Sequence, residues 1–384
     1  MQWPRTPVDR VQDFQPPFCP RQRCPLHHAP SPPRFRRHGS YQVQGRTVPR
    51  FRCPSCRSTF SRRAFSLAYF RKRPELLVPV AAGLQAGSAH RQLARTLGCA
   101  PSTVTRLSAR LGRHSILLLL RALEALEGQL DEPVVFDHFE TFEFSQDLPF
   151  GLATAVGARS WFLYGLDPAP HARGGRRTPA QERRRRKLPP RRTAGGYRRS
   201  TARSLDRLLP LLPPAGRLRL RTDGHPAYQR ALEVHAERAR IHHERHPNPA
   251  RGPKGSPRSP AARIRDRAMF PVDLLHGLFR HSLAAHRRET IAFGRRLNAL
   301  LERFFLAAIW RNFVKGVSER RGDRTTPAML VGLTDCPWSW RRVLGRRLFP
   351  EREGLEGLWR ELYRRQWRTA ALPSNTRHRP VFTG

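Results

Sequence analysis

The stretch that decides the fold is RLRLRTDGHPAYQRAL, residues 217–232. Arginines and leucines alternate up to Arg221, which is the pattern of a half-buried strand, and Pro226 favours the start of a helix. Asp223 therefore stands at the C-terminal end of a strand. In an open α/β sheet, ligand-binding and catalytic side chains gather at this edge. The alternative is that Asp223 only caps the following helix, and the local pattern does not separate the two.

A second stretch of the same kind lies upstream, PVVFDHFETFEF at residues 133–144. Its apolar residues predict a buried strand, and Asp137 is the first charge to interrupt it. A carboxylate in such a strand is costly unless it is paired or bound to a metal. Two strand-borne aspartates in a very basic chain predict a divalent-metal site that acts on phosphate.

The charge balance indicates a polyanionic partner. The 384 residues include 72 Lys and Arg against 29 Asp and Glu, a formal net charge of +43. Neutralising phosphates releases condensed counterions, so nucleic acid is the natural partner. The longest apolar run, residues 116–120, is too short to span a membrane, and the N-terminus lacks the apolar core of a signal peptide. We therefore expect an intracellular, cytoplasmic protein associated with the nucleoid.

Close cysteine pairs predict a structural zinc site. The four thiols are Cys19, Cys24, Cys53 and Cys56. Two such pairs supply the tetrahedral thiolate set of a closed zinc site, and the hairpin expected between them is typical of a zinc ribbon. The first pair is wider than C-x-x-C, which leaves His27 or His28 as alternatives to Cys24.

Residues 88–113 fit a helix-turn-helix. Gly98 ends the first helix and Pro101 starts the second, whose apolar face we expect to be buried. The polar residues left to reach base edges or phosphates are Ser102, Thr103, Thr105, Arg106 and Arg110. An ordinary helical hairpin is the alternative. Residues 115–130 predict a linker helix whose leucine run is also suited to a dimerisation face.

A third acidic ligand is expected in the second half of the chain. Asp273 is predicted to open a helix in which His276 and Arg280 share its face. Glu289 is the rival for the third acid, although a capping or ion-pairing role suits it better. Residues 168–200 are too basic and too rich in Pro and Gly to pack, so they predict an inserted loop.

The order of these features resembles bacterial insertion-sequence transposases of the DDE type. The resemblance covers most of residues 18–315 and is carried by CPSCRSTFS, RTDGHPAY and the helical pattern that begins DLLHGLFRHSLAAH. In such enzymes TDG-x-x-x-Y carries the second acid, matched by Asp223 with Tyr228. A helical acid with a polar residue at i+3 and a basic one at i+7 carries the third, matched by Asp273. Glu is usual there, so this chain departs from the family by one methylene.

The resemblance implies an α/β fold in which an RNase H-like mixed-sheet catalytic domain follows a zinc ribbon and a helix-turn-helix module. The expected segments are a tail at 1–17, a zinc ribbon at 18–65, the helix-turn-helix region with its linker at 66–130, the catalytic domain at 131–315 and a C-terminal extension at 316–384. The extension is expected to pack on the core or to grip DNA.

The implied activity is cleavage and joining of DNA. Asp137, Asp223 and Asp273 would hold Mg²⁺ or Mn²⁺, while His276 and Arg280 would contact the scissile phosphate. The expected partners are double-stranded DNA, as transposon ends and as target, and further copies of the chain in a homodimer or higher oligomer. The alternatives are a domesticated DNA-binding regulator with an impaired site and an RNase H-like nuclease.

Overall fold

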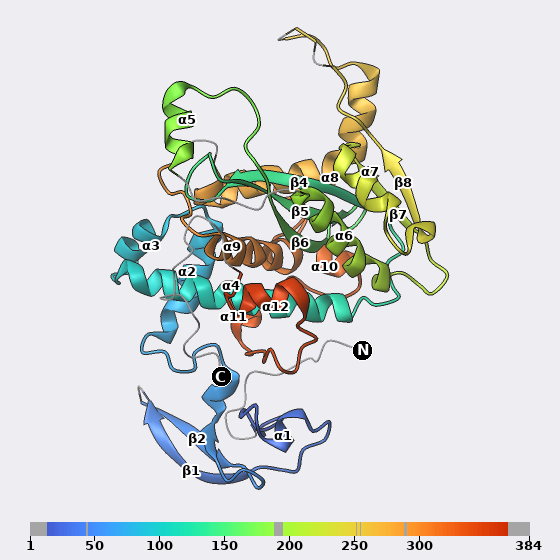
Figure 1. Ribbon diagram of the computed structural model, residues 1–384. Coiled ribbons are helices and arrows are strands. Elements are labelled where there is room, and N and C mark those ends of the chain that lie inside the picture. Colours follow the sequence, from blue (N-terminus) through green and yellow to red (C-terminus); the bar gives the residue numbers. More distant parts are fainter. Residues whose placement is uncertain are drawn as a thin grey trace.

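The computed structural model describes residues 14–43, 45–187, 195–250, 252–253, 255–287 and 290–367. A small N-terminal module lies at one end of the molecule, and a large sheet with helices lies at the other (Figure 1). Helices α2 (Leu77–Gln85), α3 (His90–Thr96) and α4 (Pro101–Glu124) lie between them. Two separate hydrophobic cores correspond to this division.

The N-terminal module is a three-stranded antiparallel sheet with a short helix. Its elements are α1 (Pro25–His28), β1 (Arg36–Val43), β2 (Arg46–Arg52) and β3 (Thr59–Ser61), followed by the 3-10 turn η1 (Arg62–Phe65). The strands pair in the order β1-β2-β3, so the hairpin expected between the cysteine pairs is confirmed. Buried phenylalanines and the cysteines form its core.

Helix α4 corrects the expected division between a recognition helix and a linker. It runs without a break over 24 residues, so both predicted segments belong to one helix. The leucine run at 116–119 is buried in the large core, where α4 packs along α9 (Leu297–Ile309). That run therefore does not provide an exposed dimerisation face.

The large sheet is mixed, which confirms the expected α/β class. Its strands are β4 (Val134–Phe142), β5 (Pro149–Gly157), β6 (Leu163–Pro170), β7 (Leu218–Thr222) and β8 (Ile241–Arg245). They lie in the order β6-β5-β4-β7-β8. The first three are antiparallel, whereas β7 is parallel to both β4 and β8.

Helices cover both faces of this sheet. Phe139 packs on Phe279 of α8 (Pro260–Ser282) and on Phe304 of α9. The adjacent His138 points to the other face, because strand side chains alternate, and there it contacts Ser200 of α6 (Gly196–Leu208). Helix α7 (Pro226–Glu233) follows β7 and contacts α6.

The basic insertion is more ordered than its composition predicts. Strand β6 continues to Pro170, helix α5 (Pro179–Arg186) begins at a Thr178 capping box, and α6 begins at Gly196. The expectation of one unstructured loop over 168–200 is therefore wrong for these parts. Residues 188–194 lie outside the described part of the chain.

The C-terminal extension packs on the rest of the protein. Its helices are α10 (Pro327–Leu330), α11 (Trp340–Leu344) and α12 (Gly357–Tyr363), after the π-helical end of α9, η6 (Trp310–Val314). The remaining 3-10 turns are η2 (Pro74–Leu76), η3 (Leu209–Leu211), η4 (Arg238–Arg240) and η5 (Ala284–His286). Trp338 and Trp359 are buried in the large core. No helix in the described ranges is long and apolar enough to cross a membrane.

Candidate functional site

Parallel pairing of β4 with β7 brings two predicted acids to one edge of the sheet. Val135 pairs with Arg221, so Asp137 and Asp223 each follow two residues beyond the last paired position. The chain leaves the sheet directly after β7, because Gly224 adopts φ +82. Asp223 is thereby placed next to Asp137, just beyond the last paired residues of β4 and β7.

Asp137 is held in an electrostatically unfavourable position. Its Oδ1 accepts from the His138 backbone N–H at 2.7 Å and from the Tyr228 hydroxyl at 3.0 Å. Burial, followed by the charge of Asp223 and then that of Asp273, raises the pKa of Asp137 to about 7. The three predicted acids therefore interact, although they come from two strands and a helix.

Asp273 lies in the middle of α8 rather than at its start, because the helix already begins at Pro260. This corrects the predicted helix boundary. The Asp273 carboxylate accepts from the guanidinium of Arg265, two turns earlier, with Nη2 at 3.3 Å from Oδ1 and a shorter contact from Nη1. The third acid is thus close enough to influence Asp137 but is engaged with a cation on its own helix.

His276 lies on the same face of α8 and faces Asp137. Its Nδ1 is 3.9 Å from Asp137 Oδ2, and its Nε2 is 2.9 Å from the Thr154 hydroxyl. That hydroxyl donates to the Asp137 carbonyl, so it accepts from His276 Nε2–H. Burial, assisted by nearby arginines, lowers the pKa of His276 to about 3. The imidazole is therefore neutral and presents a lone pair toward Asp137.

A buried polar network behind Asp137 was not predicted from the sequence. The His138 ring joins the Tyr228 hydroxyl at 2.9 Å to the Ser200 hydroxyl at 2.7 Å, and Tyr197 packs on that ring at 4.0 Å. Ser200 comes from α6, which the basic composition around it concealed. The only available signal was the position of His138 next to Asp137.

Arg280 and Glu289 are the remaining residues predicted for this site, and only Arg280 lies in the described part of the chain. The Arg280 guanidinium donates to the backbone carbonyls of His286, at 2.7 Å, and Glu140, and it lies 4.3 Å from the Phe139 ring centroid. It therefore joins α8 to β4 in this state, and its contact with phosphate stays a prediction. Glu289 lies outside the described residues.

The acidic residues fit a hard cation by their chemistry. Carboxylate oxygens are the ligands that Mg²⁺ and Mn²⁺ prefer, and a divalent cation would relieve the repulsion that raises the pKa of Asp137. These oxygens are less closely gathered than the zinc-site thiols. Among the described residues, the four cysteines are the only group of three or more potential ligands within 4.8 Å of one another.

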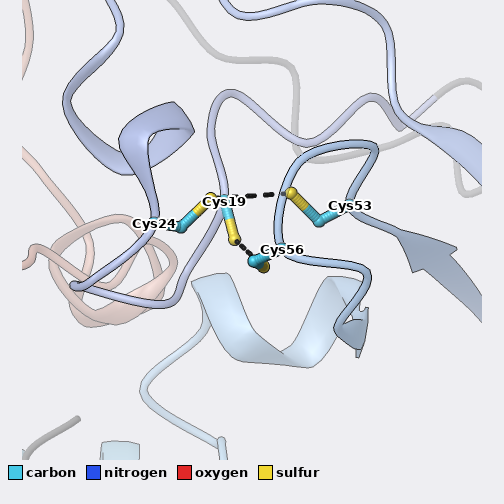
Figure 2. Close-up of side chains that lie close together, drawn as sticks. All are labelled: Cys19, Cys24, Cys53 and Cys56. Atoms are coloured by element: carbon cyan, nitrogen blue, oxygen red, sulfur yellow. Dashed lines mark hydrogen bonds between the residues drawn. The ribbon is translucent and has the colours of Figure 1, made fainter.

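The four cysteines form a site suited to zinc (Figure 2). Cys19 and Cys56 have their sulfurs 3.7 Å apart, as do Cys24 and Cys53. Sulfurs placed tetrahedrally around zinc are separated by about 3.8 Å, given a Zn–S distance of about 2.3 Å. The four thiols alone make up this group, so the cluster includes Cys24 and contains neither His27 nor His28.

The predicted DNA-contacting residues of α4 divide into two groups. Ser102 and Arg106 are exposed, and Thr103 is half-buried. Thr105 is engaged within the protein, through His90 Nδ1 at 3.1 Å and the Pro101 carbonyl at 3.0 Å. Arg110 is half-buried and faces the C-terminal part of the chain, where its charge interacts with Arg347.

No family model, curated protein or solved structure matches the chain.

Proposed function

We propose that the protein is a DNA transposase of the DDE type, which binds the ends of an insertion sequence and catalyses metal-dependent phosphodiester hydrolysis and strand transfer. One observation carries the proposal. Asp137 on β4 and Asp223 directly after β7 stand at matching positions beyond the paired residues of two adjacent parallel strands, and burial, followed by the charges of Asp223 and Asp273, raises the pKa of Asp137 to about 7. A carboxylate with a raised pKa that lies near two further carboxylates favours a metal-dependent reaction.

The fold supports the same assignment. A mixed five-stranded sheet carries two of the acids, and a helix docked on that sheet carries the third. This is the arrangement expected of an RNase H-like catalytic domain, which we assign to it on this basis. The cysteine site and the α3–α4 pair precede it in the chain, as end-binding modules would.

The protein residues have distinct roles in this proposal. Asp137, Asp223 and Asp273 would hold Mg²⁺ or Mn²⁺, and the bound ion would supply Lewis-acid activation of the attacking oxygen, which is a water in hydrolysis and a 3′-hydroxyl in strand transfer. Tyr228 and the His138 backbone orient the Asp137 carboxylate. The neutral imidazole of His276 lies beside that carboxylate, where it can accept a hydrogen bond without adding charge.

The DNA partner is supported by charge. A formal net charge of +43 favours double-stranded DNA, and the exposed Ser102 and Arg106 on α4 are available to contact it. Joining two transposon ends requires more than one copy of the catalytic site, so we expect a homodimer or higher oligomer on DNA. Its place of action would be the cytoplasm, at the nucleoid.

The test is Mg²⁺-dependent cleavage and strand transfer on DNA that carries the ends flanking the protein's own gene. Wild type is compared with Asp223→Ala, Asp273→Ala and Glu289→Ala. We expect both aspartate variants to bind the ends without joining them, and Glu289→Ala to stay active. Joining by Asp223→Ala would remove that residue from the site, and loss of joining in Glu289→Ala alone would make it the third acid.

A DNA-binding regulator is the second candidate, and one contact favours it. The Asp273 carboxylate is already paired with Arg265, and a carboxylate held by an arginine is not free to bind a catalytic metal ion. Wild type that binds the ends in the presence of Mg²⁺ or Mn²⁺ but never cuts them would support this function. Cleavage of unrelated DNA without joining would instead indicate a nuclease.

A further inference from the structure

Five arginines gather where α4 meets the C-terminal extension, away from the three acids. This arginine cluster consists of Arg71, Arg106, Arg110, Arg113 and Arg347. Three of its members recur on α4 at i, i+4 and i+7, which places them on one side of the helix. The other two come from the chain before α2 and from the segment after α11, so sequence separation conceals the cluster.

Two members of the cluster have no compensating anion in the part of the chain that the structure describes. The Nε atoms of Arg71 and Arg110 are buried without a hydrogen-bond partner, and neither side chain forms an ion pair with any residue the structure describes. Burial and the charges of Arg71, Arg347 and Arg113 lower the pKa of Arg110 to about 10. Burial and the charges of Arg113 and Arg106 lower the pKa of Arg71. Like charges concentrated in a partly dehydrated place attract an anion strongly.

Uncharged groups hold the neighbouring arginines in place. The Arg347 backbone N–H donates to the Phe65 carbonyl at 2.8 Å, and its guanidinium lies 4.5 Å from the Phe349 ring centroid. Arg113 Nε donates to the Ala109 carbonyl at 3.3 Å. These contacts hold both guanidinium groups close enough to Arg110 for their charges to act on it.

The nearby carboxylates do not neutralise the centre of the cluster. Glu302, which lies near Arg113, already accepts hydrogen bonds from Nε and Nη2 of Arg365 with both of its carboxylate oxygens. Glu351 interacts with Arg347, and it does not form an ion pair with either Arg71 or Arg110 within the described chain. The cluster is thus strongly cationic at Arg71 and Arg110.

We propose that the arginine cluster is a phosphate-binding site in which Arg71 and Arg110 grip one phosphate group together. Guanidinium groups match the geometry of phosphate oxygens, and paired contacts of this kind are strong. The ligand we assign is a phosphate of the DNA backbone, and this source rests on the proposed DNA-binding function. Arg106, the exposed member of the cluster, is one helical turn from Arg110 on α4, so the site would fix the register of the duplex rather than select its sequence.

The decisive experiment measures how affinity for a duplex of arbitrary sequence depends on salt, using the full chain. Each phosphate contact contributes about 0.9 to the slope of log K against log salt. Arg71→Gln and Arg110→Gln should each reduce the slope by about 0.9, and the double variant should reduce it no further, because both residues hold the same phosphate. Arg360→Gln removes the same charge from an exposed position on α12 and serves as the matched control.

The phosphate could come from the DNA backbone or from free inorganic phosphate, and thermal unfolding with inorganic phosphate distinguishes these two sources. Wild type should gain about 2 °C in Tm over sodium chloride of equal ionic strength, whereas the double variant should gain nothing. Without phosphate, the double variant should be at least as stable as wild type, because repulsion has been removed.

Three other results of these two experiments would each contradict the DNA source of the phosphate or the shared site itself. A Tm gain with unchanged DNA slopes would assign the site to free phosphate and overturn the DNA source. Additive slope changes, or no response to either ligand, would overturn the shared phosphate site. None of these readouts requires cleavage, so a protein that fails to cut transposon ends leaves this inference intact.

Discussion

Asp137 is the residue at which the proposed metal-binding role and the stability of the fold conflict. Its pKa in the folded protein is about 7, compared with an ordinary value of 3.8. Below pH 3.8 the carboxyl is protonated whether the chain is folded or unfolded. As the pH rises from 3.8 to 7, the unfolded chain loses this proton while the folded protein retains it, so the folded state becomes less stable.

Asp137→Asn should therefore stabilise the fold at neutral pH while abolishing cleavage. The amide keeps an oxygen for the Tyr228 hydroxyl and removes the charge, so the free energy of unfolding should rise by up to about 4 kcal/mol at pH 8. Urea unfolding at several pH values measures this, with the exposed Glu361→Gln as control. A gain that persists below pH 4 would contradict the electrostatic explanation.

Tyr228→Phe should move the pH dependence of cleavage. The hydroxyl donates to Asp137 Oδ1 at 3.0 Å, and this bond lowers the pKa of Asp137. Without it the carboxyl ionises at higher pH, so half-maximal cleavage should shift upward by about one pH unit. Cleavage rates measured across pH test this, with Tyr41→Phe in the N-terminal module as control. An unchanged profile with a uniformly lower rate would indicate a role for Tyr228 in packing only.

Residues with local sequence signals were the predictable part of the site. Asp137 interrupts an apolar strand, Asp223 ends an alternating one, and the cysteine spacing indicates a metal. Ser200 carried no such signal, because its role depends on α6 packing across the sheet onto His138. Contacts of that kind arise from tertiary structure and leave no periodic trace in the sequence.

At the level of elements, α8 decides whether Asp273 is free to bind a cation. Arg265→Gln removes the cation that occupies Asp273, so Mn²⁺ should bind about two- to fivefold more tightly. Calorimetric titration measures this without any need for turnover. Arg267→Gln is the control, because it removes the same charge from an exposed position on the same helix. Equal gains in Mn²⁺ affinity in both variants would show that only the overall positive charge of the protein matters, and not the contact between Arg265 and Asp273.

The N-terminal module, with its four cysteines, provides the second prediction at this level. Cys24→Ser should reduce bound zinc from about one equivalent to none, because the remaining three thiols leave the tetrahedral set incomplete. Metal analysis of purified protein gives the answer. Cys336→Ser, an exposed thiol outside the cluster, should keep its zinc. Retained zinc in Cys24→Ser would point to a substitute ligand.

Helix boundaries were less predictable than the helices themselves. Asp273 was expected to open a helix, yet Pro271 lies inside α8, which begins at Pro260. A proline normally ends a helix, so the sequence before it does not indicate one. Likewise, α4 absorbs the expected linker because its leucine run is covered by α9. In both cases packing outweighs the local preference.

At the scale of the whole molecule, the C-terminal extension joins the two cores. Phe349 lies in the small core, with ring centroids 5.1 Å from Phe18 and 5.9 Å from Phe65, whereas Trp359 lies in the large core. Arg352 Nη1 donates to the His27 carbonyl beside the cysteine site. The sequence indicated only loosely helical spacing here, because its partners lie some 300 residues earlier in the chain.

Phe349→Ala should therefore destabilise the N-terminal module without unfolding the large sheet. Truncating a buried phenylalanine costs about 3–5 kcal/mol, and here the loss falls on the core shared with the cysteines. Hydrogen exchange should speed up across β1 to β3 and stay unchanged in β4 and β7, and a chelator should remove zinc faster. Phe144→Ala, at a phenylalanine that is 42% exposed, is the control. Faster exchange in both regions would mean that the two cores unfold as one unit, and no change in either would mean that the cysteine site holds the module without the extension.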